Sequence, residues 1–143
     1  MDDSGGTFSA EDECNFVQID SCRFCYDKIK DRIIAKVGSA VAIEDNYPVS
    51  KGHMLIIPKN HSSNYSELSD VEKHDADTLI NEIRKNILAD DPSITGFNIG
   101  MNCGESAGQT IFHTHIHLIP RRNGDTANPR GGVRGVIPDK MGY

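Results

Sequence analysis

Three histidines alternate with other residues late in the chain, at His113, His115 and His117. Imidazole can act as a nucleophile, a proton carrier or a metal ligand near neutral pH, because its ordinary pKa is about 6.5. A spacing of two places side chains on one face of a β-strand. The pattern therefore predicts a strand over residues 110–119 that presents all three imidazoles on one face. The alternative is an exposed polar strand face, although such faces usually carry Thr, Lys or Glu.

A second pattern that could do chemistry is the Cys-x-x-Cys pair formed by Cys22 and Cys25. In an intracellular chain this spacing indicates a metal-binding or redox pair, with chance spacing as the third option. The chain holds four cysteines, which is few for the disulfide framework of a secreted protein of this length. The pair is therefore interpreted as a metal or redox site and not as a structural disulfide.

The elements that must position these residues are mainly strands. Short apolar, β-branched runs at 33–37 and 40–43 flank Gly38-Ser39, which is a hairpin signal. Further strands are predicted over residues 53–57, 96–102 and 110–119.

One long helix is also predicted, over residues 70–89. Ser69 and Glu72 have the spacing of a capping box, and apolar residues follow at helical intervals. The helix must end before Pro92, because the residue preceding a proline is disfavoured in the helical region. Strands with one helix indicate an α+β domain built on an antiparallel sheet.

Length and charge define the expected organisation of the chain. Its 143 residues suit one domain with a single core. The net charge of -6 arises at the N-terminus, since residues 1–20 hold six acids and no Lys or Arg. We expect a mobile acidic arm over residues 1–13, a folded domain over residues 14–122 and a basic, turn-rich tail over residues 123–143.

The charge distribution also narrows the expected partners. Residues 121–143 carry five basic side chains against two acidic ones, which favours a small anionic ligand. The chain as a whole is too acidic for a general nucleic-acid binder. It lacks the roughly 20 consecutive apolar residues that span a bilayer and the basic start of a secretory signal. We therefore expect a cytoplasmic protein that binds neither nucleic acid nor membranes.

Residues 109–121 resemble the signature of the histidine triad (HIT) superfamily of nucleotide hydrolases and transferases, His-x-His-x-His flanked by apolar residues. Residues 42–48 and 53–61 resemble the first half of the same family, so the similarity covers residues 22–122. Residues 128–134 resemble an extension found in some bacterial members. The resemblance implies a HIT-like fold, an antiparallel sheet of about five strands with one long helix and a short N-terminal helix.

The resemblance also implies roles for individual residues. His115 would attack the α-phosphate and form a covalent nucleotidyl-histidine intermediate that water hydrolyses. His117 would hold or protonate an oxygen near the scissile bond, and His53 would extend the hydrogen-bond network. The remaining matches are Asn102, Gln109 and Thr110 at phosphate-contacting positions, Asp45 at the ribose-binding position, and Phe24 and Ile43 at the walls of the base pocket.

A structural zinc site is implied by the same resemblance. Some HIT proteins hold zinc with a cysteine pair, a histidine after the third strand and the first triad histidine. Here those residues are Cys22, Cys25, His61 and His113. Two thiolates and two imidazoles close a tetrahedral site and leave no position for water, which makes the zinc structural. The alternative is a Cys-x-x-Cys pair without metal.

Several functions share this constellation. The leading hypothesis is hydrolysis of a dinucleoside polyphosphate such as diadenosine tetraphosphate, and the alternatives are a nucleoside phosphoramidase and a nucleotidyl transferase. Asn102 stands where dinucleoside polyphosphate hydrolases of the fragile histidine triad branch tend to have Gln, which weakens the first reading. Four arginines suited to additional phosphates strengthen it, namely Arg121, Arg122, Arg130 and Arg134.

Two further readings have less support. A metal-dependent hydrolase could chelate a catalytic ion with His115 and His117, but no carboxylate near them in sequence supplies a further ligand. A non-catalytic nucleotide-binding protein would not need the complete triad. Because family members are commonly homodimers and sheet edges need cover, we also expect a homodimer.

Overall fold

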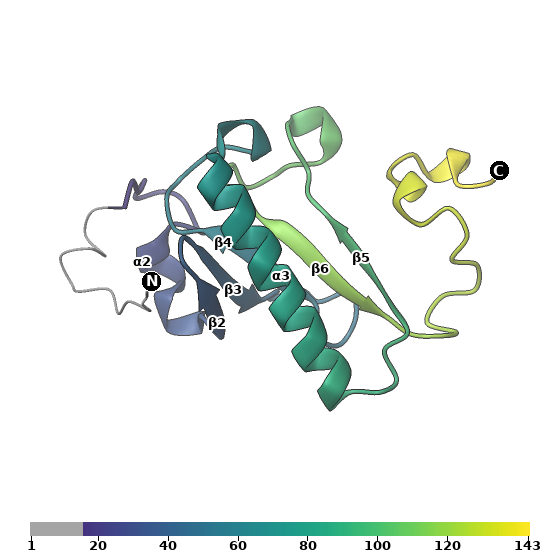
Figure 1. The fold of residues 1–143 in the computed structure, drawn as a ribbon. Helices are drawn as coiled ribbons and strands as arrows, with labels where there is room; N and C mark the ends of the chain where they lie inside the picture. The colour runs from purple at the N-terminus through teal and green to yellow at the C-terminus, as the bar shows by residue number, and fades with distance from the viewer. Residues whose placement is uncertain (1–15) are drawn as a thin grey trace.

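A five-stranded antiparallel sheet organises the protein (Figure 1). The computed structural model describes residues 16–143, so the arm predicted over residues 1–13 lies outside the described residues. The spatial strand order is β2-β3-β4-β6-β5. The α+β class and the five-stranded sheet are confirmed. The strands are β2 (Ala35–Val37), β3 (Ala40–Glu44), β4 (Met54–Pro58), β5 (Gly96–Gly100) and β6 (Ile116–Arg121).

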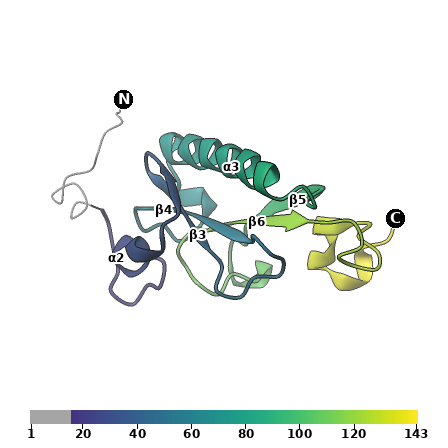
Figure 2. The same ribbon diagram turned by 90° about the horizontal axis from the view of Figure 1, so that it is seen from below.

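The long helix α3 (Asp70–Asp90) crosses one face of the sheet, and the short helix α2 (Tyr26–Ile29) lies on the other face (Figure 2). The capping box predicted for α3 is present: the Ser69 hydroxyl accepts from the Glu72 amide, and the Glu72 carboxylate accepts from the Ser69 amide. In residues 16–143, no helix has the length and apolar character that crossing a membrane requires. Within the described part of the chain there are also five 3-10 segments: η1 (Lys30–Arg32), η2 (Tyr65–Glu67), η3 (Glu105–Ala107), η4 (Gly132–Val136) and η5 (Pro138–Lys140).

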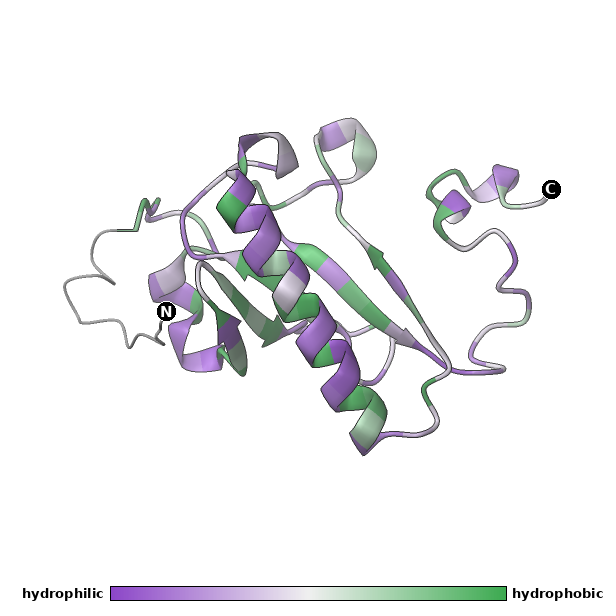
Figure 3. Cartoon of the chain, in the orientation of Figure 1, coloured by the Kyte–Doolittle hydropathy of each residue, from purple (hydrophilic) through white to green (hydrophobic). Residues whose placement is uncertain are grey.

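Strands β3 and β4 are apolar on both faces because both faces are covered. Ala42 and Ile56 pack with Leu79 of α3, whereas Ile43 and Leu55 belong to a second cluster that contains residues of the α2 segment. Figure 3 shows that these two strands are hydrophobic along their length, while α3 carries both kinds of residue. The sheet is therefore the middle of three layers where α2 covers it.

Strand β6 is covered on one face only. Its residues alternate between buried and half-buried, with Ile116 and Leu118 packed into the cluster beneath α3. His117 consequently points to the opposite face, which α3 does not cover. That face is where the site forms.

The prediction of one strand carrying all three histidines is wrong. Strand β6 begins at Ile116, so His113 and His115 lie in the irregular segment before it. The register of β6 with β4 ends at Ile116 and Ile56, and Thr114 instead bonds to Ser62 beyond the end of β4. This bend separates His113 from the other two imidazoles. Other predicted bounds differ by one or two residues: β2 begins at Ala35, β4 begins after His53, and β5 ends at Gly100.

Candidate active site and metal centre

His115 is oriented by a backbone carbonyl. Its Nδ1 lies 2.8 Å from the carbonyl oxygen of His113. A carbonyl oxygen only accepts hydrogen bonds, so this contact assigns the proton to Nδ1 and leaves the lone pair on Nε2. The Phe24 ring packs against the imidazole in a T-shaped arrangement, with ring centroids 4.9 Å apart. In the neutral imidazole, Nε2 is therefore the nitrogen with the free lone pair, which can attack or coordinate.

The tautomer of His117 is opposite to that of His115, and His53 determines it. The Val49 amide donates to His53 Nδ1 at 3.1 Å, so the proton of a neutral His53 sits on Nε2. His53 Nε2 lies 2.9 Å from His117 Nδ1, so it donates this hydrogen bond and His117 Nδ1 accepts it. His117 therefore carries its proton on Nε2. The imidazoles of His115 and His117 lie next to each other, with centroids 5.4 Å apart.

Burial keeps this histidine pair neutral. It lowers the pKa of His53 below 6.5, and the nearby Asp45 carboxylate offsets part of the shift. Burial also lowers the pKa of His117, assisted by the neighbouring His115 and His53. Both imidazoles are consequently uncharged near neutral pH, as the chain of hydrogen bonds requires.

Asp45 joins the histidines in a way that the sequence did not indicate. Its carboxylate lies 3.4 Å from His53 Nε2 and 3.9 Å from His117 Nδ1. The other oxygen accepts the Tyr47 amide at 2.8 Å, which closes the turn after β3. No carboxylate lies near the triad in sequence, and Asp45, which follows β3, supplies one in the folded structure.

His53, His115 and His117 open into a cavity of about 380 Å³, which we call the triad cavity. Of the predicted substrate-binding residues, Phe24, Asp45, Asn102 and Thr110 line it together with all three predicted catalytic histidines. Arg23 and Arg32 also line the wall and were not predicted. Arg23 lies between the two cysteines of the Cys-x-x-Cys motif. That motif predicts a role for the cysteines and none for the arginine.

Gln109 and Ile43 do not line this cavity. Gln109 is buried, and its amide is occupied by the backbone: it donates to the carbonyls of Ser63 and Ile111 and accepts from the Gly104 amide. Ile43 is fully buried and packs in the cluster that contains Phe24. Both residues position the wall of the cavity from behind, in contrast to the contacts expected from the resemblance.

The four residues predicted to bind metal lie together. Their ligand atoms are within 4.8 Å of one another, although they come from the start of α2, the loop after β4 and the segment before β6. His113 Nδ1 lies 3.4 Å from the Cys22 sulfur and 3.6 Å from the Cys25 sulfur, and His61 Nδ1 lies 3.4 Å from the Cys25 sulfur. Zinc bonds of about 2.3 Å to sulfur and about 2.0 Å to nitrogen set tetrahedral S···N edges of roughly 3.6 Å.

The protonation states also fit a metal. His113 Nε2 donates to the Pro58 carbonyl at 2.9 Å, which leaves the Nδ1 lone pair facing the two sulfurs. Burial lowers the pKa of His113 to about 4, so this imidazole is neutral. Burial raises the pKa of the Cys25 thiol to about 11, so a cation is needed to stabilise the thiolate there. These donors suit Zn²⁺.

Comparison with known proteins agrees with this geometry. The sequence profile of the HIT domain matches residues 27–124. Adenosine 5'-monophosphoramidase of Schizosaccharomyces pombe is 36% identical over 107 residues, which are 72% of this chain and 76% of that protein. An adenylylsulfatase of Arabidopsis thaliana is 38% identical over 87 residues, 59% of this chain and 43% of that protein.

A solved structure is similar as well. The crystal structure of a Zn-bound histidine triad family protein from Mycobacterium smegmatis superposes with a TM-score of 0.67 at 32% identity, covering 76% of this chain and 80% of that one. The chain described here belongs to the HIT family. The resemblance drawn from the triad and the segments upstream of it is confirmed.

Proposed function

We propose that this protein is a nucleotide hydrolase in which His115 attacks the α-phosphorus of a bound nucleotide. The observation that carries the proposal is the hydrogen bond from His115 Nδ1 to the His113 carbonyl. It leaves the lone pair of Nε2 free on a side chain that lines the cavity. Neutral imidazole is an effective nucleophile and a good leaving group, so it can divide one difficult displacement into two easier steps. Relatives named as an adenosine monophosphoramidase and an adenylylsulfatase support this reaction class.

His117 is placed to act on the leaving group. In the first step, a bond forms between His115 Nε2 and phosphorus, the bond from phosphorus to the leaving group breaks, and the departing atom keeps the electron pair, accepts a hydrogen bond from His117 Nε2 and takes any proton it needs from solvent. In the second, the oxygen of water bonds to phosphorus, the P–N bond breaks with its electron pair returning to His115 Nε2, and the proton of the water passes to solvent. His53 holds His117 in the required tautomer, and Asp45 lies beside both imidazoles.

For the substrate we propose a dinucleoside polyphosphate such as diadenosine tetraphosphate. Arg23 on the cavity wall is suited to phosphates beyond the one attacked. Arg121 and Arg122 give no such support, because they pair with Asp125 and Asp91 at 2.8 Å. The second candidate is a nucleoside phosphoramidate, which the similarity to the fission yeast enzyme favours.

A structural zinc completes the proposal. Cys22, Cys25, His61 and His113 would hold it, and the metal when bound would cross-link three segments that come from different parts of the chain. His113 would then serve the metal centre and present its carbonyl to His115.

We also propose a homodimer, since β5 is an edge strand and Ile99 on it is 45% exposed. The tail adds further exposed apolar side chains, namely Val133, Val136 and Ile137. The cytoplasmic setting expected from the sequence stays a prediction.

The test compares His115→Asn with the parent protein on adenosine 5'-phosphoramidate and on diadenosine tri- and tetraphosphate. Loss of a covalent nucleophile should reduce kcat by at least about 1,000-fold on every substrate that is cleaved, with AMP affinity retained. His74→Asn, which changes an exposed histidine on α3, is the matched control. Turnover of His115→Asn within tenfold of the parent would remove His115 from the nucleophile role.

A further inference from the structure

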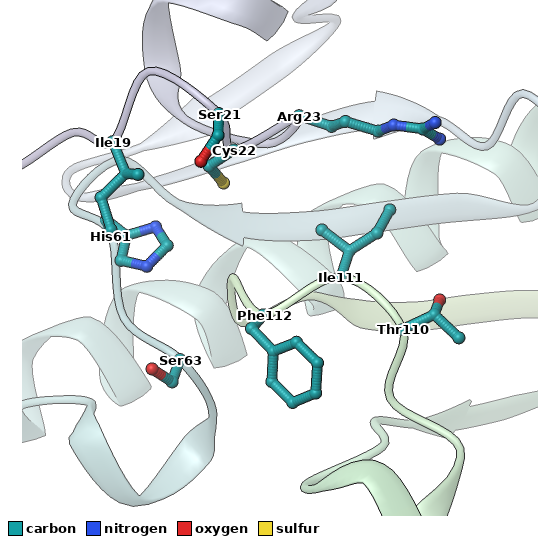
Figure 4. Close-up of a pocket in the computed structure, with 9 residues that line it drawn as sticks. All are labelled: Ile19, Ser21, Cys22, Arg23, His61, Ser63, Thr110, Ile111 and Phe112. Atoms are coloured by element: carbon teal, nitrogen blue, oxygen red, sulfur yellow. The ribbon is translucent and has the colours of Figure 1, made fainter.

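A second, larger cavity of about 590 Å³ lies beside the metal centre (Figure 4). We call it the zinc-side cavity. It contains none of the proposed catalytic histidines, and two proposed metal ligands, Cys22 and His61, form part of its wall. Its size is within the range typical of small-molecule sites. The remaining wall residues are Ile19, Ser21, Arg23, Ser63, Thr110, Ile111 and Phe112.

The zinc-side cavity adjoins the triad cavity. Arg23, Thr110 and Ile111 line both of them, so these three residues form the boundary that a ligand would cross. Figure 4 shows the Arg23 side chain extending away from His61, above Ile111 and Thr110. A guanidinium there can contact an anionic linker between the two cavities.

The wall chemistry suits a flat ring with polar edges. Phe112 is 46% exposed, which is a large apolar side chain left open beside the cavity. Ile19 is 45% exposed on the opposite part of the wall, and Ser21 and Ser63 contribute hydroxyls. An aromatic face with hydroxyls around it can stack a nucleobase and bond to its edge.

We propose that the zinc-side cavity binds the leaving half of the substrate, the second nucleoside of a dinucleoside polyphosphate, with Arg23 on the intervening phosphates. This inference rests on the proposed function and adds a specificity site to it. Because metal ligands form part of the wall, the zinc would hold the leaving-group site in shape as well as the fold. Adenosine phosphoramidate, whose leaving group is a single small amine, would leave the cavity empty.

The test measures kcat/KM on diadenosine tetraphosphate and on adenosine 5'-phosphoramidate for Phe112→Ala. Loss of stacking should lower the first value about tenfold and leave the second within twofold. Phe112→Tyr keeps the ring, so its kcat/KM on diadenosine tetraphosphate should equal that of the parent. Ser63→Trp should fill the cavity and lower kcat/KM on diadenosine tetraphosphate, as Phe112→Ala does. Val71→Ala, an exposed change on α3, is the control. Zinc content is measured for each variant, because Phe112 precedes a proposed ligand.

Binding separates this proposal from the proposed function. Affinity is measured for AMP and for a methylene-bridged diadenosine tetraphosphate that resists hydrolysis. Phe112→Ala and Ser63→Trp should weaken the dinucleotide about tenfold and leave AMP unchanged, and this readout does not require turnover. Equal effects on both ligands, or none on either, would overturn the cavity assignment. An enzyme that cleaves neither substrate but shows the binding difference would overturn the proposed function alone.

Discussion

Three imidazoles with identical spacing have three different environments because each is held by a different atom. The Pro58 carbonyl turns His113 toward the two sulfurs, the His113 carbonyl fixes His115, and His53 fixes His117. Two of these three partners are backbone carbonyls. A side-chain motif thus depends on where the backbone runs beside it, and replacing the imidazoles one at a time should produce different defects.

The neutral His53–His117 pair should make stability depend on pH. Both pKa values are lowered by burial, so between pH 6.5 and the lower folded-state values the unfolded chain binds more protons than the folded one. Stability is therefore full above pH 6.5 and falls as pH decreases from there, by at most about 1.4 kcal/mol per pH unit for each histidine.

Thermal unfolding between pH 7 and pH 5, with zinc in the buffer, should show this loss. His53→Asn removes one of the two groups and should flatten the slope, whereas His74→Asn on the exposed side of α3 should leave it unchanged. A slope that is the same in the parent and His53→Asn would show that this pair does not contribute to the acid sensitivity.

At the scale of elements, the proposed metal centre would join segments that the sheet does not hold. Cys25 immediately precedes α2, His61 follows β4, and His113 precedes β6. Gln109 joins the η3 loop to the same region through the Ser63 carbonyl. These links would fix the irregular segment on which His115 lies. Their loss should therefore lower the free energy of unfolding before it lowers activity.

Cys22→Ser should lower the zinc content from about one per chain and lower Tm by about 5 °C or more, as expected when a closed structural site is lost. Activity at a permissive temperature should fall less than stability does. Metal analysis and thermal unfolding check this, with Cys103→Ser, an exposed cysteine, as the matched control. Parent protein that contains no zinc without any exposure to chelator would contradict the assignment.

At the scale of the whole molecule, the basic tail folds on itself. The guanidinium carbons of Arg130 and Arg134 lie 4.9 and 5.1 Å from the Tyr143 ring centroid, and Arg134 also donates to the Lys140 carbonyl. Neither arginine lines the triad cavity. Gly132 and Val133 instead border a cavity of about 400 Å³ beside Asn102 and His117. The expectation that these arginines contact the outer phosphates gains no support from this placement.

Replacing both Arg130 and Arg134 with Ala should therefore change kcat/KM for diadenosine tetraphosphate and for adenosine phosphoramidate by the same factor. Removing the guanidinium contacts with Tyr143 loosens the tail as a whole, which affects both substrates alike. Light scattering on the same variant reports whether the proposed dimer is retained. A tenfold shift in the ratio of the two kcat/KM values would return these arginines to the phosphate-binding role.

Much of the architecture could be predicted because its causes are local. The capping box at Ser69, the apolar spacing of α3 and the stop before Pro92 predicted the helix to within one residue of its observed end at Asp90. Alternation and turn residues predicted the five strands, with errors at their ends. The triad with its upstream segments was enough to predict the HIT family, which the comparisons confirm.

The arrangement of the site was decided by tertiary contacts, which no local pattern encodes. Thr114 pairs with Ser62 instead of continuing the ladder, so β6 begins only at Ile116, after His115. Asp45 follows the end of β3, and folding of the sheet brings its carboxylate next to His53 and His117. The proton positions of His113 and His117, the hydrogen bond from the Gln109 amide to Ser63 and the two adjoining cavities likewise arise from residues far apart in sequence. Local propensity determined the elements, whereas long-range packing and backbone carbonyls determined which nitrogen of each histidine is free.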